Sequence, residues 1–376
     1  MNAKRSLTRH LFSAVATALV VATAWGSPGI ALGATVTDRG ALRTNLDNYS
    51  GWYTNRDCGW SEPLATSPGS SLWVFCDSDI NGPNNYHAFY ESTSASGPDT
   101  PGTAPTLVEN GPYGVPAQFL PASTSTSSCT RTPRWASGMI LLAFTTKIMI
   151  PYVVQCVNGL DYSTSLRFGI TEYDASTNQF VSAGTNDAIF QAASLGVAYQ
   201  LGSPAYYNGF YYFYGSHCDS SAYTVCTSGR VLSARVAVGS NGATTRPWLN
   251  PMNYQWWDGS KWQSNVFSAQ SIIAGITPVG DVSVDWYPQF GKYLLVEQTD
   301  GVGRFRVWQS SDPGQGWTVR ASGQVPNCQP NSKGSLCRAL IGHPELSTST
   351  QLAISFFHPS NDVYNNRIRV ATMPLN

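Results

Sequence analysis

Five short apolar segments recur along the chain and limit the folds open to it. Each consists of β-branched or aromatic residues that follow a turn and end in polar residues, which is typical of a strand in a hairpin. They are SLWVFCDSD (71–79), GMILLAFTTKI (138–148), GFYYFYGSHC (209–218), GKYLLVEQTD (291–300) and QLAISFFHPS (351–360). No long stretch has helical periodicity. The recurrence predicts an all-β protein built from five similar units.

The size of the recurring unit indicates which all-β fold this is. The segments begin 60 to 82 residues apart, which leaves room for about four short strands, the content of one β-propeller blade. In four units a further strand-like segment with a polar turn lies directly upstream: TPRWASG, SPAYYNG, DWYPQFG and HPELSTST. We therefore predict a single five-bladed β-propeller over residues 35–376, whose innermost strands direct polar side chains at a common axis. A β-sandwich with several hairpins is the alternative.

Residues 1–34 have the features of a secretory signal peptide. Lys4, Arg5 and Arg9 precede the apolar run LFSAVATALVVATAW, and small residues follow at 31–34. The run is too short for a comfortable membrane span, and no later stretch is long enough. We expect a soluble, monomeric protein that is secreted to the extracellular medium.

Charge and composition limit the kinds of molecule that the protein can bind. Three of the 22 basic residues lie in the predicted signal peptide, so 19 basic and 22 acidic residues remain. This balance offers no basic surface for nucleic acid or for an anionic membrane. Only 12% of the residues are charged, and 12% are aromatic. Trp and Tyr rings suit both stacking on a sugar ring and packing in a β-core, and both interpretations stay open.

Eight cysteines follow the predicted signal peptide. An even number in an exported chain predicts disulfides. Their spacing suggests that each cysteine bonds to its nearest neighbour along the chain, in the pairs 58–76, 129–156, 218–226 and 328–337. A zinc site is not indicated, because there is no C-x-x-C pair and there are only five His residues. We expect neither a metal nor another cofactor.

Two aspartates adjoin the first predicted disulfide in mirrored order, Asp57-Cys58 and Cys76-Asp77. If the two cysteines face each other on antiparallel strands, residue i pairs with residue 134 − i, and Asp57 faces Asp77. Directly paired side chains have Cβ atoms about 4.5–5.5 Å apart. Two carboxylates this close repel each other, so one of them holds a proton more tightly.

Such a pair suits glycoside hydrolysis. One carboxylic acid protonates the leaving oxygen, and the other carboxylate attacks or activates water. A separation of about 5–5.5 Å accompanies retention of the anomeric configuration, which the pairing predicts. The alternatives are that Asp57 caps a turn, that Asp79 rather than Asp77 points at the axis, or that Asp77 and Asp79 bind calcium.

The stretch around the two aspartates resembles the N-terminal signature of glycoside hydrolase family 183. That signature combines a Gly-Asp-Gly-like turn, Ser-x-Pro-Leu and Leu-Trp-x-Phe-Gly-Asp-Thr. The corresponding segments here are Arg-Asp57-Cys-Gly-Trp, Ser61-Glu-Pro-Leu64 and Leu72-Trp-Val-Phe-Cys-Asp77-Ser78. Later motifs of the family resemble PRWASGMI (133–140), YQWWDGSKW (254–262), GDVSVDWYPQFGKYLLV (280–296) and GHPEL (342–346). The resemblance extends over nearly all of the mature chain, with cysteines at two positions that are usually glycine.

The resemblance implies a five-bladed propeller that cleaves internal α-D-arabinofuranosyl linkages of D-arabinan, in arabinogalactan and lipoarabinomannan. It implies that Asp57 and Asp77 are the catalytic carboxylates. Our working assignment takes Asp77 as the nucleophile and Asp57 as the acid/base. Two other functions stay open: a propeller glycosidase for another furanoside, such as L-arabinan or fructan, and a non-catalytic sugar-binding propeller.

Five further residues are predicted to bind substrate: Trp135, Arg134, Asp281, His343 and Asp79. The Trp135 ring offers a stacking platform, the Arg134 guanidinium offers paired hydrogen bonds, and Asp281 stands where the family tends to carry an acid. All but Asp79 also have a structural interpretation. Trp135 then packs between blades, Arg134 pairs with an acid at a blade edge, and Asp281 and His343 belong to the starts of strands.

Overall fold

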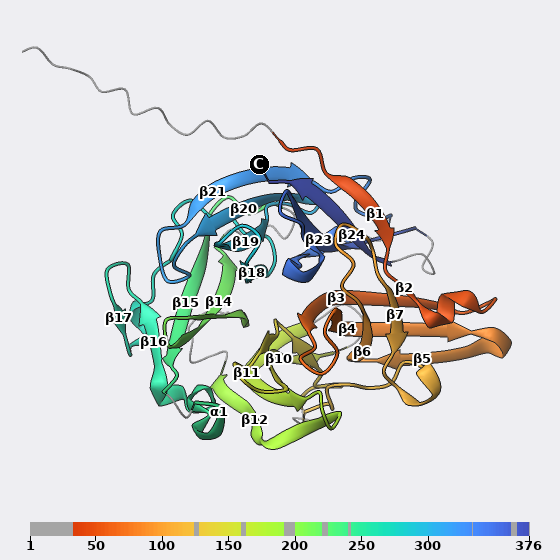
Figure 1. Ribbon diagram of the computed structural model, residues 1–376, viewed down its shortest axis with the longest axis horizontal. Coiled ribbons are helices and arrows are strands. Elements are labelled where there is room, and N and C mark those ends of the chain that lie inside the picture. Colours follow the sequence, from red (N-terminus) through yellow and green to blue (C-terminus); the bar gives the residue numbers. More distant parts are fainter. Residues whose placement is uncertain are drawn as a thin grey trace, which may run out of the picture.

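The computed structural model describes residues 33–123, 128–158, 163–191, 200–219, 225–239, 242–332, 334–361 and 367–375. Five β-sheets form a ring around a central axis, as Figure 1 shows. The predicted five-bladed β-propeller is therefore confirmed. Of the predicted signal peptide, residues 1–32 lie outside the described residues. Within the described ranges, no helix has both the length and the apolar character needed to cross a membrane.

The first two blades follow each other along the chain. From the axis outward, the first consists of β3 (Tyr53–Pro63), β4 (Ser70–Gly82), β6 (Thr93–Pro98), β7 (Thr106–Glu109) and β2 (Arg43–Thr44), and β5 (Tyr86–Tyr90) also pairs with β4. The second consists of β8 (Arg134–Ala136), β10 (Lys147–Val157), β11 (Ser163–Asp174) and β12 (Gln179–Gln191), and β9 (Ile140–Leu141) also pairs with β10.

The third blade comprises β13 (Gln200–Tyr207), β14 (Phe210–Cys218), β15 (Gly229–Ala237), β16 (Tyr254–Trp257) and β17 (Trp262–Gln263). The fourth comprises β18 (Val282–Tyr287), β19 (Lys292–Gln298), β20 (Arg304–Ser310) and β21 (Thr318–Gln324). The fifth comprises β22 (Arg338–Gly342), β23 (Gln351–His358), β24 (Arg367–Pro374) and β1 (Thr37–Ala41). Because β1 pairs with β24, hydrogen bonds between the two ends of the chain complete the last blade.

Helical turns are short and lie in the connections. They are η1 (Asn45–Asn48), η2 (Pro83–Asn85), η3 (Pro112–Gly114), α1 (Gly242–Thr245), η5 (Pro247–Leu249), η6 (Pro251–Asn253), η7 (Val266–Ser268) and η8 (Pro344–Leu346). The segment HPELSTST, predicted as part of a hairpin, contains η8 instead of a strand. Proline at the first helical position favours this turn, because its fixed φ suits a helix start and its missing N–H is not needed there.

Four of the five predicted segments contain the second strands of their blades, β4, β14, β19 and β23. The prediction for 138–148 was wrong in detail, because this segment holds β9, a turn and only the start of β10. The turn includes Phe144, whose φ of 61° ends the extended backbone. Apolar composition alone therefore placed the second-blade strand several residues too early.

The apolar core lies between adjacent blades. One cluster joins Leu72 and Val74 of β4 to Ile148 and Ile150 of β10, and another joins the fourth and fifth blades. Because both faces of a blade are covered by its neighbours, its central strands are buried on both sides. This explains the long apolar runs that dominate β10 and β19.

Buried serines link neighbouring innermost strands around the axis. Ser137, Ser203 and Ser283 each form a hydrogen bond of 2.7 or 2.8 Å to the backbone of the innermost strand in the next blade. The strands approach closely here: a Cβ atom at Gly202 would lie 2.0 Å from the carbonyl oxygen of Ser137. The small side chains at these positions allow the inner strands of neighbouring blades to approach each other closely.

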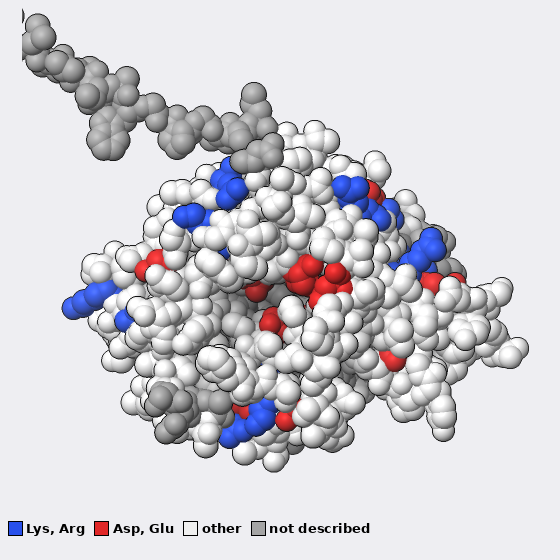
Figure 2. Space-filling view, in the orientation of Figure 1, with Lys and Arg blue, Asp and Glu red and all other residues white. Residues whose placement is uncertain are grey.

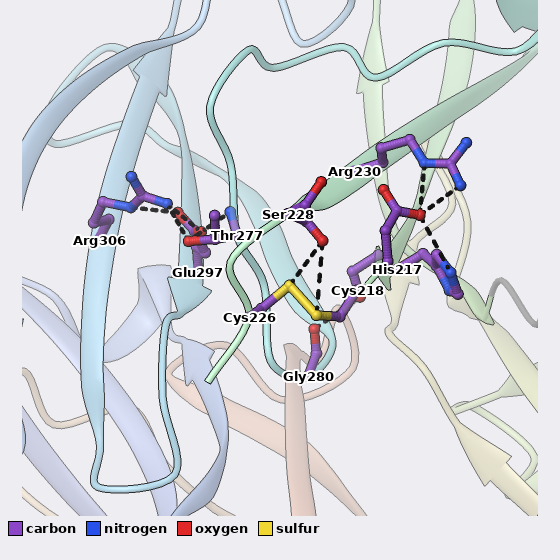
Figure 3. Close-up of a disulfide and its surroundings, with 11 residues drawn as sticks. His217, Cys218, Cys226, Ser228, Arg230, Thr277, Gly280, Glu297 and Arg306 are labelled. Carbon is purple, nitrogen blue, oxygen red and sulfur yellow. Dashed lines mark hydrogen bonds and ion pairs between the residues drawn. A yellow bond between two sulfur atoms is a disulfide. The ribbon is translucent and has the colours of Figure 1, made fainter. Parts of the chain in front are cut away.

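All four predicted disulfides are present, so the prediction from spacing is confirmed. They are Cys58–Cys76, Cys129–Cys156, Cys218–Cys226 and Cys328–Cys337. Figure 3 shows Cys218–Cys226 beside Gly280, the residue before Asp281. This disulfide of the third blade therefore lies close to the start of β18.

Candidate active site

Asp57 lies on β3, the innermost strand of the first blade. The predicted register between β3 and β4 holds on both sides of the disulfide but shifts at Cys58, which lies opposite Phe75 instead of Cys76. Cys58 has a φ of 64°, and a residue in this conformation produces a bulge in the strand. The prediction that Asp57 and Asp77 form a regular, directly opposed pair was therefore wrong. The strand pairing therefore no longer supports retention of the anomeric configuration.

The two aspartates nevertheless interact electrostatically. Burial of the Asp77 carboxyl, together with the charge of Asp57, raises the pKa of Asp77 to about 6. The indole Nε1 of Trp135 donates a hydrogen bond of 3.0 Å to Asp77 Oδ1, which acts in the opposite direction. Trp135 thus contacts one member of the predicted catalytic pair through this hydrogen bond. The Asp77 carboxyl therefore retains a proton up to a pH of about 6.

Arg338, the first residue of β22, holds Asp57. Its Nε and Nη2 donate hydrogen bonds of 2.9 and 2.7 Å to Asp57 Oδ2, and its guanidinium lies 4.1 Å from the centre of the Phe357 ring. The charge of Asp57 raises the pKa of Arg338. Asp57 is thus the carboxylate of a partly exposed ion pair. Sequence reasoning missed Arg338, although it follows Cys337 as Asp77 follows Cys76.

Asp281 lies at the same end of the inner strands, directly before β18. Its side chain is exposed to solvent, yet the surrounding protein displaces enough water to raise its pKa to about 6. The charge of Asp57 adds to this effect, so Asp281 and Asp57 are electrostatic neighbours. Asp57 on β3 therefore interacts electrostatically with both Asp77 on β4 and Asp281 before β18, and these three acids form the candidate site.

A second ion pair lies near Asp77. Arg131 Nη1 is 3.5 Å from Glu91 Oε1, and both side chains are largely buried. The charge of Arg131 lowers the pKa of Asp77, and the charge of Glu91 raises it, so their effects oppose each other. Neither residue was predicted from the sequence, since each is an isolated charge in a loop or turn.

Two predicted substrate-binding residues have structural partners instead. The Arg134 guanidinium donates hydrogen bonds of 2.8 and 2.6 Å to Asp187 of β12, which is the blade-edge pairing left open above. Adjacent residues on a strand point to opposite faces, so Arg134 points away from the side that Trp135 occupies. Asp79 Oδ1 lies 2.7 Å from His87 Nε2 on β5, toward the outer part of the first blade. The ion pair favours the structural interpretation of Arg134, and His87 gives Asp79 a partner; binding of substrate by these two residues stays a prediction.

The prediction for His343 was wrong. Its side chain is fully buried, with Nδ1 2.6 Å from Ser61 Oγ and Nε2 2.8 Å from Ser355 Oγ. The ring stacks on Trp73 with 4.8 Å between the centroids. With both nitrogens and one face occupied, His343 has no surface left for a substrate and serves to join the first and fifth blades.

The site has the groups needed for acid–base chemistry. It supplies one carboxylate in an ion pair and one carboxyl whose pKa lies near neutral, which is the division of protonation states that a pair of catalytic carboxyls requires. Across the described ranges, no group of three or more His, Cys, Asp or Glu side chains is placed to hold a metal ion.

The fold is similar to that of known glycoside hydrolases. The chain superimposes on Zg3597, a family 117 glycoside hydrolase of the marine bacterium Zobellia galactanivorans, with a TM-score of 0.55, 11% identity and coverage of 92% of each chain. A second glycoside hydrolase gives a TM-score of 0.52 at 10% identity, covering 90% of this chain and 92% of the other. At such identities the similarity concerns the fold alone. No protein-family profile matches the chain, and no curated protein matches its sequence.

Proposed function

We propose that the protein is a secreted glycoside hydrolase that cleaves internal α-D-arabinofuranosyl linkages of D-arabinan with Asp57 and Asp77. The observation that carries this proposal is the unequal surroundings of the two carboxyls. Asp57 is ion-paired with Arg338, whereas burial and the charge of Asp57 raise the pKa of Asp77 to about 6. Glycoside hydrolysis needs one carboxyl charged and one protonated.

From these surroundings we infer roles opposite to those of our working assignment. Asp77 acts as the general acid and transfers its proton to the glycosidic oxygen as the bond from that oxygen to the anomeric carbon breaks. Asp57 attacks the anomeric carbon directly, or removes a proton from the water that attacks it. Asp281 adds a negative potential near the positive charge that develops on the sugar ring.

The substrate class rests on the family resemblance, and the reaction class has two further supports. The five-bladed ring is similar to glycoside hydrolases of known structure. A family-specific motif, Leu72 to Ser78, contains Asp77. Secretion is supported by the four disulfides, because such bonds persist in oxidising compartments, and by the predicted signal peptide.

Release of reducing sugar from D-arabinan tests the proposal. We expect Asp57→Asn and Asp77→Asn to lower the rate by about 10²–10⁴-fold, the usual contribution of an acid or base. The matched control is Asp258→Asn, in the turn between β16 and β17, where Asn preserves the turn; it should act like the wild type. Equal release by all variants would refute the catalytic roles.

The same assay separates the alternatives. Release from L-arabinan or fructan without release from D-arabinan would assign another furanoside. Tight binding of polymer without any product would make the protein a sugar-binding propeller. The anomer of the first product, followed by NMR, distinguishes attack by Asp57, which gives retention, from attack by water, which gives inversion.

A further inference from the structure

A second group of acidic side chains lies toward the opposite end of the inner strands. Glu62 follows Asp57 by five residues on β3, and Asp285 follows Asp281 by four residues in the β18 region. At about 3.3 Å per residue, these steps amount to roughly 13–16 Å along the strands. The charges of Glu62 and of Glu345, in η8 after β22, both act on Asp285. The three acids are therefore neighbours, away from Asp57 and Asp77.

This end of the ring is hollowed. In Figure 1, η8 is the dark blue coil beside the axis, and in the same orientation Figure 2 shows acidic side chains around a hollow at the centre of the face. Glu62, Asp285 and Glu345 line a pocket of about 710 Å³ together with residues of the second, third and fourth blades. A pocket of this size accommodates one or two sugar rings.

Aromatic rings form one wall of the pocket. Trp286 and Tyr206 line the pocket and are 45% and 44% exposed, so part of each ring is open to a ligand. Tyr293 holds both of them in place: its ring lies 4.9 Å from that of Trp286, and its hydroxyl donates a hydrogen bond of 2.5 Å to the carbonyl oxygen of Tyr206. The wall is therefore formed before any ligand arrives, which lowers the entropic cost of binding.

Glu345 provides a polar group that lacks a partner. Its side chain is only 4% exposed, and Ser61 Oγ donates a hydrogen bond to its Oε1. Its Oε2 is buried and has no hydrogen-bond partner among the described residues. A buried carboxyl oxygen without a donor is costly, so a hydroxyl group of a ligand bound in the pocket would stabilise it.

The other two carboxyls favour a neutral ligand. Burial, with a smaller contribution from the charge of Glu345, raises the pKa of Glu62 to about 8, and burial likewise raises the pKa of Asp285. With a pKa of about 8, Glu62 keeps its proton at neutral pH and can donate as well as accept a hydrogen bond, as sugar hydroxyls do. A cation would have to displace these protons before it gained an ion pair.

We propose that this pocket is a second carbohydrate-binding site, in which a sugar ring stacks on Trp286 and Tyr206 and its hydroxyls bond to Glu62, Asp285 and Glu345. The site binds without cleaving and holds the protein on its polysaccharide while Asp57 and Asp77 act on another part of the polymer. The binding itself does not depend on hydrolysis.

Retention in affinity electrophoresis tests this site, with the full-length Asp77→Asn variant as the parent and soluble D-arabinan, L-arabinan or fructan in the gel. Trp286→Ala and Glu345→Gln are added to the parent, and Tyr113→Ala, whose side chain is fully exposed outside the pocket, is the control. We expect Trp286→Ala to weaken binding of at least one polymer by about tenfold, because one aromatic contact contributes up to about 1.5 kcal/mol. Glu345→Gln should weaken it less, and Tyr113→Ala not at all.

The outcomes distinguish this proposal from the catalytic one. If the wild type releases no sugar but Trp286→Ala still lowers retention, the second site stands and the hydrolase assignment falls. If Trp286→Ala and Glu345→Gln are both folded by circular dichroism and retained like the parent on every polymer, the second site is refuted. Calorimetric binding of choline that is lost in Trp286→Ala, with unchanged retention on every polymer, would make this a cation site and would equally overturn the proposal.

Discussion

Arg338 donates two hydrogen bonds to one oxygen of Asp57, from Nε at 2.9 Å and from Nη2 at 2.7 Å. The two residues stand 281 positions apart in the sequence, on the innermost strands of the fifth and first blades. The ion pair therefore forms only once the ring has closed. Asp57, a proposed catalytic carboxylate, therefore gains its ion-pair partner only when the fold is complete.

Replacing Arg338 tests this link. We expect Arg338→Gln to lower kcat/KM by about 10²-fold, since an ion-paired hydrogen bond contributes about 1.5–3 kcal/mol. Asp77 also lies in the field of Arg338, so loss of the cation should raise the pKa of Asp77 and move the basic limb of the pH–rate profile upward. Arg134→Gln, which breaks the ion pair with Asp187, is the control and should alter stability but not the profile. An unchanged limb in Arg338→Gln would contradict the prediction.

The hydrogen bond from Trp135 to Asp77 gives a second prediction. This bond lowers the pKa of Asp77, so Trp135→Phe should raise it, by about one unit or less for a bond of about 1.5 kcal/mol. A general acid works in its protonated form, so activity should persist to higher pH. The pH dependence of kcat/KM measures this shift, and Trp257→Phe on β16 is the control. If the basic limb of the kcat/KM profile does not move, Asp77 is not the general acid.

Cys58 has a backbone conformation that favours glycine, with a φ of 64°. Opening the Cys58–Cys76 bond, which spans 18 residues, should cost about 3 kcal/mol of unfolding free energy. Two double variants that lack this bond can be compared, both with Cys76→Ala. The one with Cys58→Gly should be more stable than the one with Cys58→Ala by about 1 kcal/mol, because glycine adopts this φ without strain. Urea denaturation measures both variants. Equal stability would show that the bulge relaxes when the bond is absent.

Glu62 makes stability depend on pH. Its pKa is raised to about 8, so the folded state keeps a proton that the unfolded state releases near its model value of 4.5. This contribution to stability is fully present below pH 4.5 and is lost as the pH rises through about 8. Asp77 and Asp281, with pKa values of about 6, add to the same trend.

The variant Glu62→Gln removes that titration but retains an acceptor for the N–H of Leu141. We expect its Tm to exceed that of the wild type by roughly 2 °C or more at pH 9, the shift that about 1 kcal/mol produces in a protein of this size, and to match it at pH 4. Thermal melts at the two pH values provide the measurement. An equal difference at both would exclude Glu62 as the titrating group.

Much of the fold was predictable because its signals are local. Strand-like runs and turns recur at the length of a blade, and cysteines that bond lie within 8 to 27 residues of each other. The exception, 138–148, shows the limit of this approach. The run is apolar from Met139 to Phe144, and the turn that divides it begins within this apolar part, around the exposed Phe144, where composition does not reveal it.

The sequence by itself determined the five blades and the four disulfides, since each follows from short-range pattern. It also put Asp57 and Asp77 on adjacent strands, but the bulge at Cys58 that breaks their direct pairing appeared only in the structure. Only the tertiary structure decided that Arg338 pairs with Asp57, that Arg134 pairs with Asp187, and that His343 is buried. These contacts join residues that are 53 to 282 positions apart. Closure of the ring selects such partners through side-chain geometry, and no local pattern in the sequence records it.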